Sequence, residues 1–124
     1  MSFVRVRTLA LVSLLCCVFS LLCIAGGPGF RTQHLLEDHY LKHGREFGHI
    51  SQEQYLHFAQ QLRDSHPGRF VLESRRADRG GAKFDVRRGW FVAYDADGTI
   101  RTFFIPNDGI RYFERQARNY GPSR

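Results

Sequence analysis

The chain has 124 residues, with 18 Lys and Arg against 12 Asp and Glu and a formal net charge of +6. This length predicts a single domain. All three cysteines lie within the first 23 residues, so a domain that begins after them has no disulfide framework, no thiol nucleophile and no cysteine-ligated zinc site. Leaving out Arg5 and Arg7 lowers the net charge from +6 to +4, and nearly all the remaining basic residues are arginine. This composition indicates either an anionic partner such as phosphate or a GC-rich genome.

Residues 1–27 have the pattern of a secretory signal peptide. Two arginines precede an apolar run over residues 9–25, and a Gly-Gly-Pro-Gly segment follows. Small residues stand at the expected cleavage points, after Ala25 or Gly27. The alternative is an uncleaved anchor, because the apolar run is nearly long enough to span a bilayer. We therefore expect a secreted or periplasmic protein, or a membrane-anchored one if the segment is retained.

Residues 28–118 are expected to form the single domain, followed by a frayed tail over 119–124. Its beginning, residues 30–48, predicts a helix that ends at Gly44 or Gly48. A second helix is predicted after Ser51, because a Ser followed three residues later by Gln is a capping-box pattern. The predicted core face of this helix comprises Tyr55, Phe58, Ala59 and Leu62.

After residue 69 the pattern changes to strands. We expect four short strands, over 70–74, 83–87, 90–95 and 99–105, with a basic and mobile loop over 75–81. The Asp-Ala-Asp-Gly segment at 95–98 predicts a tight turn followed by a left-handed glycine bulge. Residues 110–117 predict a short helix. The predicted fold class is therefore α+β, with two N-terminal helices packed on an antiparallel β-sheet and a short C-terminal helix.

His39 and His43 are the main catalytic candidates. They are four residues apart, so they lie on one face of the first helix, within reach of one ligand. The same face holds Glu46 and apolar residues such as Leu36 and Phe47. His43 lies near the helix C-terminus, where the dipole favours the protonated form, so we assign it as general acid and His39 as general base. The alternative is that both are half-buried histidines bonded to the backbone.

The same spacing would also suit zinc, with Glu46 or His34 as a third ligand. His34, however, falls outside the arc shared by the other two histidines, and the segment reads HYLKH rather than HExxH. The turn at 95–98 lacks the downstream ligands and closing glutamate of a calcium loop. We therefore expect no metal and no cofactor.

Arg101 and Thr102 are the next candidates, for phosphate and hydroxyl contacts. If the turn is regular, Thr102 pairs with Val92, and Arg101 and Thr102 then point to opposite faces of the sheet. A regular hairpin cannot aim both at one substrate, whereas a bulge can. The alternatives are a solvated edge residue for Arg101 and a strand-forming filler for Thr102.

The remaining candidates would bind substrate. Tyr112 and Arg111 follow the last strand and would roof a cleft with a ring and a charge, with core packing as the alternative for Tyr112. Lys42 and Glu46 belong to the first helix, beside the two histidines.

Two motifs resemble the C-terminal ribonuclease toxin domains of bacterial polymorphic and contact-dependent toxins, which have the barnase/EndoU/colicin/RelE-like fold. The first, H-x3-H-G-x-x-F-G, is matched from His39 to Gly48 and is followed by Tyr55 near the start of a helix. The second, D-x-D-G-x-I-R-T-[FY]-[FY]-x-P, is matched from Asp95 to Pro106. The resemblance covers nearly all of the predicted domain.

This resemblance implies a small α+β fold and metal-free cleavage of RNA, with a cyclic phosphate and a free 5′-hydroxyl as products. It implies that His39 and His43 are acid and base, Arg101 the phosphate clamp and Thr102 a hydroxyl contact. We therefore expect a monomeric, toxin-like ribonuclease whose partners are RNA and a cognate immunity or inhibitor protein. The alternative is a non-catalytic exported domain of the same fold that binds nucleic acid or another anionic polymer.

Overall fold

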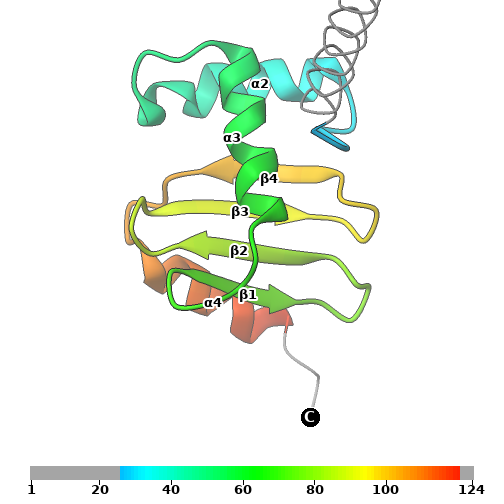
Figure 1. Ribbon diagram of the computed structural model, residues 1–124, viewed down its shortest axis with the longest axis vertical. Coiled ribbons are helices and arrows are strands. Elements are labelled where there is room, and N and C mark those ends of the chain that lie inside the picture. Colours follow the sequence, from blue (N-terminus) through cyan, green and yellow to red (C-terminus); the bar gives the residue numbers. More distant parts are fainter. Residues whose placement is uncertain (1–25, 121–124) are drawn as a thin grey trace, which may run out of the picture.

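The computed structural model describes residues 26–120 (Figure 1). The three cysteines, the expected signal peptide up to residue 25 and residues 121–124 lie outside this range. No helix within the described range is long and apolar enough to cross a membrane. Cleavage or retention of the N-terminal segment stays a prediction.

The chain forms an α+β domain in which helices precede four consecutive antiparallel strands and one helix follows them. The elements are α2 Gln33–His43, the 3₁₀ helix η1 Gly44–Phe47, α3 Gln52–Asp64, β1 Val71–Arg75, β2 Gly81–Asp85, β3 Trp90–Tyr94, β4 Ile100–Phe104 and α4 Ile110–Tyr120. The strands lie in the order β1-β2-β3-β4, each antiparallel to the next. The predicted α+β class, with an antiparallel sheet and a short C-terminal helix, is confirmed. Asn119 and Tyr120, which were expected in the frayed tail, belong to α4.

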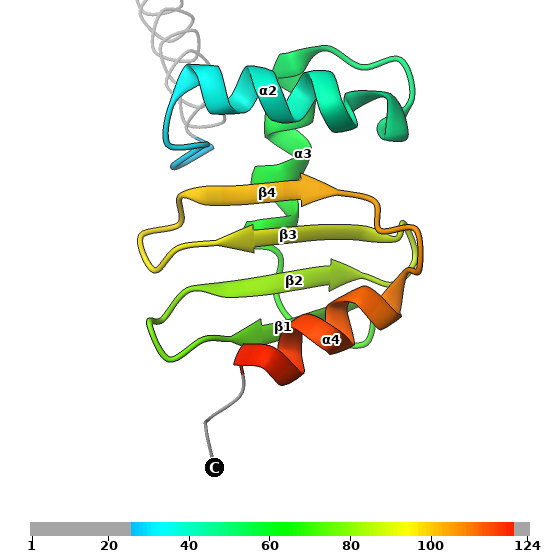
Figure 2. The ribbon, with the colours of Figure 1, turned by 180° about the vertical axis from the view of Figure 1, so that it is seen from behind.

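The helices lie on three sides of the sheet. α3 crosses one face of it (Figure 1), and α4 lies against the opposite face, over β1 and β2 (Figure 2). α2 lies beside the edge strand β4 and runs in the same direction as that strand (Figure 2). We call the two surfaces of the sheet the α3 face and the α4 face.

The first helix starts later than predicted. Phe30 forms a parallel bridge with Ile100, and Thr32 caps the helix by accepting a backbone hydrogen bond of 3.1 Å. The start predicted at residue 30 is therefore wrong, because a tertiary strand contact holds Phe30 in extended backbone. Both predicted ends occur. The α-helix stops before Gly44, and the following 3₁₀ turn stops at Gly48, which has a left-handed φ of 92°.

The second helix begins as its capping box predicts. Gln54 N donates to Ser51 Oγ at 3.1 Å, and Ser51 N donates to Gln54 Oε1 at 2.9 Å. These two bonds satisfy backbone donors that the first turn of a helix otherwise leaves unpaired. They fix the start of α3, whose buried face then lies across the sheet.

Apolar side chains are buried on both faces of the sheet. The cluster on the α3 face comprises Leu36, Tyr55, Ala59, Leu62, Val92, Ile100 and Phe103, and the cluster on the α4 face comprises Ala82, Phe84, Phe91 and Phe113. All five residues of β2 are buried, so this strand lacks the alternation that marks a half-exposed strand. The strand predicted over 83–87 is therefore displaced by two residues, and Val86 and Arg87 belong to the exposed turn after it.

A β-bulge in β4 changes the predicted register. Tyr94 pairs with Ile100, but Ala93 pairs with Thr102, so Arg101 is an extra residue on β4. The predicted pairing of Val92 with Thr102 is wrong, because Val92 pairs with Phe103. The shift turns Phe103 into the core of the α3 face, where its side chain is fully buried. Burial of a large aromatic ring favours this register over the regular one.

Candidate functional site

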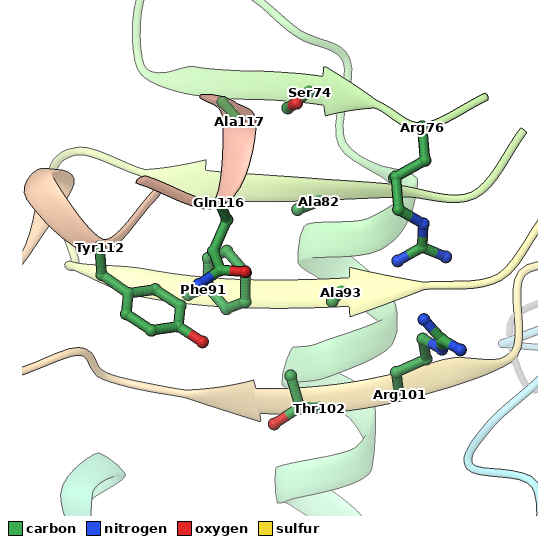
Figure 3. Close-up of a pocket in the computed structure, with 11 residues that line it drawn as sticks. Ser74, Arg76, Ala82, Phe91, Ala93, Arg101, Thr102, Tyr112, Gln116 and Ala117 are labelled. Atoms are coloured by element: carbon green, nitrogen blue, oxygen red, sulfur yellow. The ribbon is translucent and has the colours of Figure 1, made fainter. Parts of the chain in front are cut away.

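A cavity of about 300 Å³ lies between α4 and the sheet (Figure 3). Its floor is a row of small side chains, one from each strand, that pair across the sheet. The row comprises Ser74, Ala82, Ala93 and Thr102, and the next row on the same face comprises Leu72, Phe84, Phe91 and Phe104. A row of short side chains beside a row of large ones leaves space over the middle of the sheet.

Two arginines form one end of the cavity. The guanidinium groups of Arg76, in the loop after β1, and of Arg101, on β4, face the same space (Figure 3). The side chain of Arg76 is only 8% exposed, and its Nη2 donates to Tyr94 O at 3.1 Å. Arg76 belongs to the loop that was expected to be mobile, but these contacts anchor it. Arg101 remains half exposed.

Asp95 connects the arginines to each other. Its Oδ1 lies 2.9 Å from Arg101 Nε and 3.5 Å from Arg76 Nη2, and its Oδ2 lies 3.6 Å from Arg31 Nη2. The sequence indicated only a turn at Asp95. The structure adds that this carboxylate orients guanidinium groups from three separate segments. An anion that enters the cavity would compete with Asp95 for Arg101, whose side chain is more exposed than that of Arg76.

Aromatic and amide groups form the opposite end. The Tyr112 ring meets the rings of Phe91 and Phe104 edge-on, with centroids 4.9 and 5.1 Å away. Gln116, one turn further along α4, also lines the cavity and points its amide toward it (Figure 3). The cavity therefore has a cationic end and an aromatic end, separated by the floor of small side chains.

The two candidate histidines lie outside this cavity, along the edge of β4. Their ring centroids are 6.4 Å apart, and both residues are half-buried. His39 lies against Phe30 and His43 stacks on Phe104, with centroid distances of 4.9 and 5.2 Å. The predicted common face of His39 and His43 is confirmed.

Hydrogen bonds determine which nitrogen of each histidine carries the proton. A carbonyl oxygen only accepts, so His39 Nδ1 donates to Leu35 O over 2.8 Å, which leaves Nε2 as the acceptor of the neutral ring. His43 Nδ1 lies 2.5 Å from Glu46 Oε2, and the carboxylate likewise holds a proton on Nδ1. These bonds engage Nδ1 of each ring and leave Nε2 as the nitrogen that would exchange a proton with a ligand.

Glu46 is engaged through both of its oxygens. Oε2 pairs with His43, and Oε1 accepts a hydrogen bond of 3.1 Å from the backbone N–H of Ile105. This second bond fixes the carboxylate against the end of β4. The geometry favours a role in orienting His43 over the predicted contact with substrate.

The geometry of α2 and β4 relates the histidines to the cavity. α2 runs beside β4 in the same direction (Figure 2), and His43 stacks on Phe104 at the end of that strand. His39, four residues before His43, lies against Phe30, which forms a bridge with Ile100 at the start of β4. Thr102, whose side chain lines the cavity, stands between Ile100 and Phe104 on this strand. Phe104, which touches both His43 and Tyr112, separates the two regions.

Other predicted residues are not brought together with these groups. Lys42 and Arg111 are exposed, and neither lines the cavity. His34, the alternative zinc ligand, is exposed and pairs with Asp38 at 3.4 Å. Within residues 26–120, no group of three or more His, Cys, Asp or Glu side chains is arranged to hold a metal ion.

Three polar side chains of the cavity were not predicted from the sequence: Ser74, Arg76 and Gln116. Ser74 occupies an inconspicuous strand position, and Arg76 follows another arginine in a loop, so neither has a local pattern that marks it. Gln116 does lie four residues after Tyr112, on the same face of α4. That spacing is the one sequence pattern that could have identified Gln116.

No protein-family model matches this chain, and no curated protein matches it.

Proposed function

We propose that the protein is an exported, toxin-like endoribonuclease that needs no metal and cleaves RNA through attack of the ribose 2′-hydroxyl. The observation that carries the proposal is the histidine pair. The two rings lie side by side, 6.4 Å between centroids, and each has its Nδ1 hydrogen-bonded within the chain. The two motifs that resemble ribonuclease toxin domains support the same chemistry, with a monomer acting on RNA and a cognate inhibitor protein as a second partner.

In the proposed reaction, Nε2 of His39 accepts the proton of the 2′-hydroxyl while the 2′-oxygen bonds to phosphorus. The bond from phosphorus to the 5′-oxygen breaks, and Nε2 of protonated His43 donates a proton to that oxygen. The products are a 2′,3′-cyclic phosphate and a 5′-hydroxyl. Glu46 stabilises the imidazolium of His43 before the transfer, because its carboxylate accepts the hydrogen bond from Nδ1.

Arg101 and Thr102 act on the phosphate in this proposal. The guanidinium of Arg101 is half exposed, so it can leave Asp95 for the phosphate, two oxygens of which accept the parallel hydrogen bonds of its fork. Negative charge on the phosphate grows as the 2′-oxygen adds, so a donor at this point stabilises the transition state more than the bound substrate. Thr102, which lines the cavity beside Arg101, supplies a hydroxyl.

The test is cleavage of a fluorogenic RNA oligonucleotide by the purified chain in excess EDTA, with analysis of the product ends. We expect cleavage with 2′,3′-cyclic phosphate ends, and a decrease of roughly 10²–10⁴-fold in kcat for His39→Ala and for His43→Ala. His57→Ala is the matched control, because His57 is an exposed histidine on α3. A DNA oligonucleotide of the same sequence should remain intact, since it lacks the attacking hydroxyl.

Other outcomes would reject the proposal. If cleavage stops in EDTA, the reaction needs a metal ion and the metal-independent mechanism is wrong. If cleavage persists in both histidine variants, the catalytic groups are not His39 and His43. RNA binding without any cleavage, by wild type and variants alike, would assign the chain to the non-catalytic alternative, an exported domain that binds an anionic polymer.

A further inference from the structure

We propose that the cavity between α4 and the sheet is a binding site for one nucleotide, which places a single base of the RNA at Tyr112 and Gln116 and its phosphate between Arg76 and Arg101. This inference rests on the proposed function, because it names the part of the RNA substrate that the cavity takes. It assigns base recognition to a cavity that the histidines do not enter.

The chemistry of the two ends of the cavity matches the two parts of a nucleotide. The cationic end presents two guanidinium groups to one space (Figure 3), which suits the oxygens of a phosphate. The aromatic end presents the half-buried Tyr112 ring, held edge-on against the buried ring of Phe91, and unpaired bases of RNA stack on such aromatic side chains. A ligand with only one of these parts would leave half of the cavity unused.

The floor of the cavity accounts for the space between the ends. Ala82 and Ala93 are paired neighbours at the centre of the sheet, and the hydroxyl residues Ser74 and Thr102 stand at the two ends of the same row. Short side chains along this row admit a flat ring and a ribose, while the hydroxyl groups offer hydrogen bonds to either. The volume of about 300 Å³ is at the small end for a ligand site, which suits one nucleotide and excludes a duplex.

Gln116 is the group that can distinguish one base from another. Its side-chain amide carries both a donor and an acceptor and points toward the cavity (Figure 3). Glutamine amides read the edges of bases through paired hydrogen bonds. A base stacked on the aromatic end would present its edge to this amide, so Gln116 determines which base is preferred.

The first experiment measures binding of the four ribonucleoside 3′-monophosphates, the four nucleosides and inorganic phosphate to the purified chain by calorimetry. We expect at least one monophosphate to bind at least tenfold more tightly than its nucleoside and than inorganic phosphate. Ala117→Leu, which fills the cavity from α4, should weaken this binding at least tenfold. Ala77→Leu, in the exposed part of the β1–β2 loop, is the matched control and should bind as the wild type does.

The second experiment tests base recognition with Gln116→Leu, which keeps the size of the side chain and removes the amide. We expect the ratios between the dissociation constants of the four monophosphates to shrink severalfold in this variant. The exposed control Gln61→Leu should keep the wild-type ratios. Circular dichroism melting identifies any variant that fails to fold, and because Ala117→Leu and Gln116→Leu change the cavity differently, one folded variant is enough for the test.

The outcomes separate this inference from the proposed function. Nucleotide binding that Ala117→Leu abolishes, in a chain that leaves RNA intact, would support the cavity as a nucleotide site and reject the ribonuclease. RNA cleavage with monophosphates bound no more tightly than inorganic phosphate, or bound equally by Ala117→Leu, would overturn the cavity assignment and leave the ribonuclease standing.

Discussion

Arg101 and Thr102 are adjacent in the chain, and both side chains line the same cavity on the α4 face of the sheet. Adjacent residues of a regular strand point to opposite faces. The bulge at Arg101 removes this alternation, because Thr102 pairs with Ala93 while Arg101 has no residue opposite to it. The bulge therefore allows one short segment to present a guanidinium and a hydroxyl to a single ligand.

Arg101→Ala should reduce catalysis with little effect on stability. We expect kcat on RNA to fall by about 10²–10³-fold, the loss typical of one donor that stabilises a transition-state charge. Because the Arg101 side chain is about half exposed, we expect the free energy of unfolding to change by less than about 0.5 kcal/mol. Steady-state kinetics and urea unfolding measure the two effects. Arg118→Ala, on the exposed side of α4, is the control, and an equal loss of activity there would show that the effect is only one of net charge.

Glu46→Gln tests the carboxylate that holds His43. A glutamine has one oxygen, so it cannot accept from both His43 Nδ1 and Ile105 N as the carboxylate does. We expect kcat to fall by about tenfold or more, but less than in His43→Ala, with KM almost unchanged because Glu46 does not touch RNA in the proposed reaction. The exposed α2 residue Glu37, changed to Gln, is the control. A large rise in KM would instead show that Glu46 binds the substrate, and the role of orienting His43 would be wrong.

Stability should fall as the pH rises above 10. Burial raises the pKa of the Tyr55 hydroxyl well above its usual value of 10.0, and the nearby carboxylate of Glu46 adds to the effect. Above that value the unfolded chain loses this proton while the folded chain keeps it, so the folded state binds more protons and loses stability with each increase in pH. Urea unfolding at about pH 9 and about pH 11 measures the change.

Tyr55→Phe separates this contribution from that of Tyr94, whose pKa is also raised by burial. The variant should lose less stability between the two pH values than the wild type does. At neutral pH it should be less stable by about 1–3 kcal/mol, because the Tyr55 hydroxyl donates to the carbonyl of Phe103 and its removal leaves a buried acceptor unpaired. If the variant and the wild type lose the same unfolding free energy between the two pH values, the pKa of Tyr55 is not raised in the folded state.

Ser51→Ala should destabilise the protein by about 1 kcal/mol, because it removes the acceptor for the Gln54 backbone N–H at the start of α3. The reciprocal bond from Ser51 N to the Gln54 side chain suggests a double-mutant cycle with Gln54→Ala. We expect the double variant to lose less than the sum of the two single losses. Full additivity in chemical unfolding would mean that the two bonds form independently.

Several elements of the fold could be predicted from local patterns alone. The capping box at Ser51 and the tight turn at Asp95 have short sequence signatures, and both are present in the structure. The common face of His39 and His43 follows from a spacing of four residues. These features depend on residues within one or two turns of each other, so the chain determines them before it folds.

The composition of the candidate site was decided by contacts between distant segments. Arg76, in the loop after β1, and Arg101, on β4, face one cavity because both strands belong to one sheet. Glu46 is held by the backbone of Ile105, a contact across 59 positions of the chain. The bulge that aims Arg101 and Thr102 together depends on the burial of Phe103 against α3. Local sequence thus determined which segments are helices or strands and which side chains share a helix face. Only tertiary packing decided the strand register and the cavity. The register depends on burying the Phe103 ring against α3, and no local sequence pattern shows which distant residues will bury a ring.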